Sequence, residues 1–249
     1  MRPRSHSPSA AGPPNLWRMS TPSGGALAPG RFRLLLCSLV LFIVGTAALP
    51  ASGTGRFLEF VLLAGTLVIA LVELRVRGES RLVPIALASS VIFVTVVDQA
   101  MRLRHLPVIA GILAALFSGV VVWLAYASVM RPDRSVSDRI VGAICVYLLI
   151  GLAWASLFET LDFVAPGSFR FPADTAWARP GTVRYRYLSF VTLATLGYGD
   201  VTPQTALAGT LAALEAVSGQ LYIGITVARL VALSLADRAV ESKGPKTGE

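Results

Sequence analysis

Long apolar runs, separated by short polar segments, dominate the pattern of this chain. Six such runs cover residues 34–49, 57–74, 82–100, 106–130, 140–161 and 205–235. An α-helix rises about 1.5 Å per residue, so about 20 residues cross a hydrocarbon core of about 30 Å. The first run is slightly short, but its flanking residues can extend it. The pattern predicts an all-α membrane protein with six transmembrane helices.

The two ends of the chain are polar. Residues 1–31 are rich in Pro, Ser, Gly and Arg and contain no acidic residue, so we expect a disordered basic tail. This long basic region also disfavours a cleaved signal peptide, although the sequence leaves open whether the first span is retained. Residues 237–249 are expected to form a short C-terminal tail.

Composition agrees with a membrane location. Hydrophobic residues make up 54% of the chain and charged residues only 14%, whereas soluble domains carry about 25% charged residues. The net charge of +8 is spread over the ends of the apolar runs, so we expect no nucleic-acid partner. With six spans, 15 Lys and Arg lie on the side of the termini and 7 on the other. This bias predicts a multi-pass cell-membrane protein with both termini cytoplasmic.

One short stretch, Thr195-Leu196-Gly197-Tyr198-Gly199-Asp200, is the main candidate for a functional site. Glycine reaches backbone angles closed to other residues, and alternating glycines can turn successive carbonyls toward one side. Rings of carbonyls are what a dehydrated cation needs in a pore. A glycine-rich turn in a soluble protein is the alternative, but the surrounding apolar runs disfavour it.

These residues resemble the T-x-G-Y-G-D selectivity-filter signature of pore-loop potassium channels, and the resemblance covers roughly residues 138–236. It implies a re-entrant pore helix at Tyr187–Ala194 and a filter loop, both between helices five and six. Many members have threonine where this chain has Ala194, but that hydroxyl is not a filter ligand. A single signature implies that three further copies complete a homotetrameric pore. The resemblance also implies that the permeant K⁺ is the only metal and that no cofactor is needed. The lipid bilayer would surround the tetramer.

The resemblance assigns a role to each residue of the signature. The filter residues would coordinate K⁺ through backbone carbonyls, and Thr195 also through its hydroxyl: Thr195, Leu196, Gly197, Tyr198 and Gly199. The ring of Tyr198 would face away from the pore, and Asp200 would lie at the outer mouth, where its charge concentrates cations.

Support residues are expected around this filter. Tyr187 either donates a hydrogen bond to Asp200 or anchors at the membrane interface. Glu215 either braces the back of the filter or faces the cavity, because a carboxylate at that depth needs a partner or water. Gly219 is either a gating hinge or a point of close helix packing. The inner vestibule would be lined by three apolar residues of the last run: Ile223, Val227 and Val231.

The expected domains are the tail 1–31, a four-helix region 32–137, a pore domain 138–236 and the tail 237–249. A voltage sensor needs basic residues at every third position of its helix, yet residues 106–130 contain none. We therefore expect a potassium-selective channel subunit without strong voltage gating, and no enzyme. The alternatives are a potassium-translocating transporter subunit and a non-conducting membrane interaction subunit.

Overall fold

The structure, a computed structural model, describes residues 31–49, 53–73, 82–101, 106–130, 136–173 and 181–242. Its helices are α1 (Arg31–Ala48), α2 (Gly53–Glu73), α3 (Leu82–Met101), α4 (Leu106–Val129), α5 (Val136–Val164), α6 (Thr182–Leu193) and α7 (Ala206–Ser242). Two short strands, β1 (Phe169–Arg170) and β2 (Thr202–Pro203), flank α6 in the sequence. The described residues of each expected apolar run lie in a helix of their own, to within one residue at either end. The tail expected over residues 1–31 lies outside the described residues, apart from Arg31.

Three helices of the described part of the chain are long and apolar enough to cross a membrane. Their spanning portions are Gly111–Val129, Ser137–Val164 and Ala206–Leu235, while α1 and α2 contain the shorter apolar stretches Phe32–Ala48 and Phe57–Val72. The described part of the chain is thus mostly helical, with three candidate membrane-spanning helices. The count of six spans stays a prediction.

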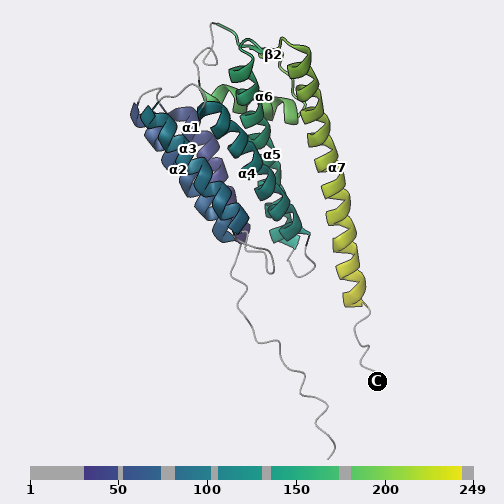
Figure 1. The fold of residues 1–249 in the computed structure, drawn as a ribbon. Helices are drawn as coiled ribbons and strands as arrows, with labels where there is room; N and C mark the ends of the chain where they lie inside the picture. The colour runs from purple at the N-terminus through teal and green to yellow at the C-terminus, as the bar shows by residue number, and fades with distance from the viewer. Residues whose placement is uncertain are drawn as a thin grey trace, which may run out of the picture.

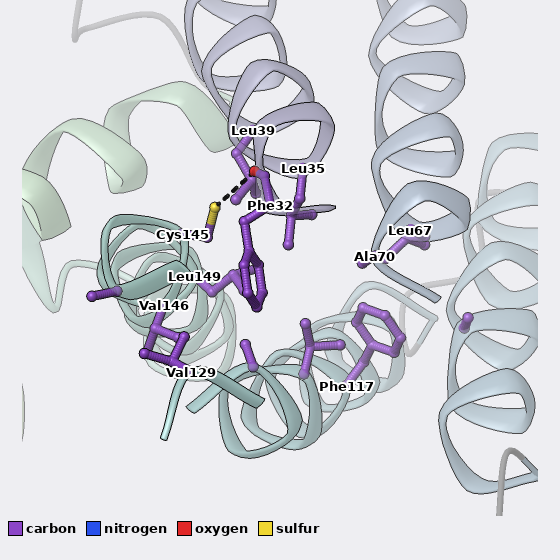
Figure 2. Close-up of a cluster of buried hydrophobic side chains, with 14 of the residues drawn as sticks. Phe32, Leu35, Leu39, Leu67, Ala70, Phe117, Val129, Cys145, Val146 and Leu149 are labelled. Atoms are coloured by element: carbon purple, nitrogen blue, oxygen red, sulfur yellow. Dashed lines mark hydrogen bonds between the residues drawn. The ribbon is translucent and has the colours of Figure 1, made fainter. Parts of the chain in front are cut away.

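Helices α1 to α5 pack together, and α7 lies on the side of α5 and α6 away from α2 and α3 (Figure 1). Figure 2 shows the main apolar cluster, in which Phe32 and Leu35 of α1 meet Val146 and Leu149 of α5. The Cys145 thiol also donates to the Phe32 carbonyl at 3.6 Å. Because lipid is as apolar as these side chains, close packing rather than water exclusion holds such helices together.

The two strands form a small antiparallel sheet that the sequence pattern did not indicate. Phe169 pairs with Pro203 and Arg170 with Thr202. The sheet joins the segment after α5 to the segment before α7, and therefore fixes both ends of the chain portion that contains α6. Aromatic side chains fill the space beneath it, with ring centroids of Phe158 and Phe169 5.2 Å apart.

Two expected boundaries differ from the structure. The short helix before the signature begins at Thr182 instead of Tyr187, because the polar residues Thr182 and Arg186 find partners on neighbouring helices. The last helix continues past Leu235 to Ser242, because helical backbone does not require an apolar sequence.

Candidate functional site

The signature residues form an extended ribbon with an alternating backbone. Thr195, Gly197 and Gly199 have φ angles of +57°, +53° and +77°, whereas Leu196 and Tyr198 between them have none above zero. Glycine adopts such angles readily, but a β-branched L-residue such as Thr195 does so at a cost of roughly 1–2 kcal/mol. Alternation of this kind turns successive carbonyls toward the same side of the ribbon.

The last turn of α6 holds the base of this ribbon. The Val191 carbonyl accepts hydrogen bonds from the amides of Leu196 at 2.9 Å and Gly197 at 3.4 Å. The Thr195 amide donates to the Thr192 carbonyl at 2.9 Å. The position of the ribbon therefore follows the position of α6.

The ribbon is exposed along one side of the single chain. Every residue from Thr195 to Gly199 is exposed, with Leu196 57% and Tyr198 67% accessible. Such large apolar and aromatic side chains are unusual on a free surface when they are contiguous. This surface is therefore available to further chains.

The far end of the ribbon is tied back to α6. The Tyr187 hydroxyl donates to Asp200 Oδ2 at 2.5 Å, and Asp200 Oδ1 accepts from the Val201 amide at 2.9 Å. The expected hydrogen bond between Tyr187 and Asp200 is thus present, while its bracing role stays a prediction. Burial and the hydrogen bond with Asp200 raise the pKa of Tyr187 to about 12, so the hydroxyl keeps its proton at neutral pH.

Glu215 of α7 is fully buried behind α6. Its Oε1 atom lies 2.5 Å from the Ser189 hydroxyl, which also lies 2.7 Å from the Gly151 carbonyl oxygen. These contacts join α5, α6 and α7 at one point. Of the two interpretations of Glu215, the contact with α6 agrees with bracing, and burial within the single chain disfavours a cavity-facing carboxylate.

Gly219 lies where α7 passes close to the end of α6. A Cβ atom added at this position would lie 2.3 Å from the Leu193 carbonyl oxygen. The helix α7 continues without a break through this position. Close packing therefore accounts for a glycine here, and a hinge at Gly219 stays a prediction.

Beyond Gly219, the expected vestibule residues share an exposed stripe of α7. Ile223, Val227 and Val231 are 42%, 54% and 52% accessible. Gln220 continues the stripe toward the ribbon, and its Nε2 donates to Thr195 Oγ1 at 3.4 Å. Sequence reasoning missed Gln220, although its spacing of three residues from Ile223 places it on the same helix face.

A second group connects α6 to α5 and contains the acidic residue Asp162. Its Oδ2 accepts a hydrogen bond from the Tyr185 hydroxyl at 2.6 Å and lies 3.6 Å from Arg184 Nη2. Sequence reasoning assigned no role to Arg184 and Tyr185, which lie three and two residues before Tyr187.

Comparisons with known proteins agree with this geometry. Neither the curated proteins nor the solved structures yielded a match to the chain. Residues 112–234 match a family model described as ion channel. This range, about half of the chain, includes most of α4, all of α5 and α6, the ribbon and most of α7. An ion channel passes ions without a catalytic centre or a cofactor. The match to this family therefore implies that the protein is not an enzyme. Through these residues the chain belongs to an ion channel family.

Proposed function

We propose that the chain is a subunit of a potassium-selective channel whose filter is the ribbon Thr195–Gly199. The observation that carries this proposal is the alternation of φ at Thr195, Gly197 and Gly199. Carbonyls directed to one side can replace the hydration shell of K⁺. Asp200 at the end of the ribbon attracts cations to the mouth.

The pore is a homotetramer in this proposal. One ribbon supplies only one side of an ion cage, and the chain contains a single signature. The exposed ribbon and the exposed apolar stripe of α7, which includes Val227 and Val231, support contact with three further copies. The short helix α6 re-enters the membrane, and its C-terminal end directs the negative end of its dipole toward the waiting cation.

Both termini lie in the cytoplasm in this arrangement, and the ribbon opens to the outside. This orientation rests on the distribution of Lys and Arg between the two sides. The proposed channel has no strong voltage gating, because residues 106–130 contain no basic residue that could move through the field.

Purified protein in liposomes tests this function. We expect the tetramer to pass K⁺ down its gradient and to pass Na⁺ far more slowly. Absence of K⁺ flux from tetrameric protein would exclude a conducting channel and favour a non-conducting subunit. Equal flux of both ions would exclude selectivity. Flux that requires a second driving ion would indicate a transporter subunit.

A glycine substitution tests the assignment of the filter. Gly197→Ala places a side chain on a residue with φ +53°, at a cost of roughly 1–2 kcal/mol per subunit. We expect K⁺ flux to be lost, because the four ribbons must hold the same geometry. Gly65→Ala is the matched control, since a Cβ at this position in α2 meets nothing within 4 Å. Retained selective flux in Gly197→Ala would refute the filter assignment.

A further inference from the structure

Arg186 joins α6 to two helices that lie outside the filter region. Its Nη1 donates to Thr46 Oγ1 of α1 at 2.6 Å, and its Nη2 donates to Glu59 Oε1 of α2 at 2.6 Å. The guanidinium also lies over the ring of Phe42, 4.6 Å from its centroid. One side chain of α6 therefore contacts two helices, α1 and α2, that are far from it in the sequence.

The partners of Arg186 are themselves fixed. The Thr46 hydroxyl donates to the Phe42 carbonyl at 2.6 Å, which leaves its oxygen free to accept from Arg186. The Thr182 hydroxyl accepts from Arg186 Nη2 at 2.9 Å and donates to Glu59 Oε1 at 2.7 Å. Both hydroxyl protons and three of the five guanidinium N–H donors in this group, the Arg186 cluster, thus have a defined acceptor. A planar guanidinium suits this pair of acceptors, because its donors point in fixed and different directions.

Arg184 makes the corresponding contact on the other side of α6. Two residues along a helix correspond to a rotation of about 200°, so the two arginines project in nearly opposite directions. Arg184 faces Asp162 of α5, whereas Arg186 faces α1 and α2. The helix therefore has an ion pair on each of these two sides.

A tilt of α6 reaches the ribbon directly. Val191, whose carbonyl accepts from Leu196 and Gly197, lies five residues after Arg186, or about 7.5 Å along the helix axis. The intervening helix is continuous. Movement at Arg186 is therefore passed to the amides that fix the base of the ribbon.

We propose that Arg186 is a positioning residue for ion selection, through which α1 and α2 set the position of α6 and of the ribbon. This inference rests on the proposed channel function. It assigns to α1 and α2 a part in selectivity and makes Glu59 and Thr46 its contact points on those helices.

The test measures K⁺ and Na⁺ flux through the full chain in liposomes, per reconstituted tetramer. The variants are Arg186→Gln, Glu59→Ala, their combination and Arg186→Lys. Arg170→Gln is the matched control, because Arg170 is an exposed arginine of the neighbouring strand β1. Thermal unfolding of each tetramer is measured alongside, so that loss of assembly is separated from loss of selectivity.

We expect Arg186→Gln to lower the ratio of K⁺ to Na⁺ flux on the order of tenfold, which lies within the usual range of coupling between contacting residues. Glu59→Ala should act in the same direction, and the double variant should be little worse than Arg186→Gln alone. Arg186→Lys should be intermediate, because an ammonium reaches one of the two partners. Arg170→Gln should match the unmodified protein.

Each contrary outcome has a definite meaning. If the unmodified tetramer passes no K⁺, the channel function fails and this inference falls with it. If it conducts selectively and the Arg186 and Glu59 variants keep its flux ratio, the inference is overturned while the channel function stands. If Arg186→Gln does not assemble into tetramers, the flux ratios of Glu59→Ala and Arg186→Lys decide whether the inference stands. An unchanged flux ratio with fewer tetramers shows that Arg186 serves folding alone.

Discussion

Replacing Gly219 by alanine tests how α7 supports the ribbon. The new Cβ would lie 2.3 Å from the Leu193 carbonyl oxygen, whereas ordinary contacts begin near 3.4 Å. The two helices must therefore separate by about 1 Å, because a backbone carbonyl cannot rotate away as a side chain can. Leu193 is the last residue of α6, so this displacement occurs two residues before Thr195.

The expected magnitude combines two opposing effects. Overpacking in a close contact costs about 1–3 kcal/mol, and alanine gains about 1 kcal/mol over glycine as a helix former. Because the clash is with backbone, we expect a net loss of about 1–2 kcal/mol per subunit and a fall in K⁺ flux. The measurements are thermal unfolding of the tetramer and flux from liposomes.

Gly224→Ala is the matched control for this prediction. It lies on the same helix, and a Cβ at this position meets nothing within 4 Å in the chain. We expect it to raise or leave unchanged the melting temperature and to conduct. If Gly219→Ala behaves in the same way, the packing argument is wrong. A stable Gly219→Ala tetramer with altered opening would instead support a hinge.

Substitutions at two further residues, Glu215 and Tyr187, test the contacts behind and above the ribbon. Glu215→Gln should keep stability and flux, because the amide can donate to the Ser189 hydroxyl while that hydroxyl donates to the Gly151 carbonyl. Glu215→Ala removes this partner and should lower the stability of the tetramer by roughly 2 kcal/mol per subunit. Equal damage from both, in thermal unfolding, would show that the charged carboxylate is required. Tyr187→Phe should reduce K⁺ flux several-fold by removing the donor to Asp200, whereas an interface anchor would tolerate phenylalanine. The pKa of Tyr187 is raised to about 12. The Tyr187 hydroxyl therefore keeps its proton, and its hydrogen bond to Asp200, until the pH rises through this value. We accordingly expect K⁺ flux not to depend on the titration of Tyr187 near neutral pH.

The six long helices of the described residues could be predicted because each carries a long apolar run with few charged residues. The boundaries of α6 could not, because Thr182 and Arg186 are polar residues whose helical conformation depends on partners in α1 and α2. The β1–β2 sheet was also missed, since two-residue strands leave no alternating pattern to detect.

The ribbon itself could be predicted from its residues, and so could the Tyr187–Asp200 contact. Both depend on short spacing along the chain. The contacts of Ser189 and Arg186 bring together residues 26 and 127 positions apart. Nothing in the local sequence specifies such distant pairs, although Glu59 at the edge of an apolar run was a sign that a cation lay nearby.

The first helix meets the rest of the molecule at both of its ends. Phe32, near its start, lies against Cys145 of α5, and Thr46, near its other end, accepts from Arg186 of α6. These two points are about 21 Å apart along the helix. Because α1 is attached at both points, it cannot move as a rigid body relative to α5 and α6 without breaking one of the two contacts. A fragment that began at α5 would expose the surface that Phe32 covers and would leave the Arg186 guanidinium without Thr46 and Glu59.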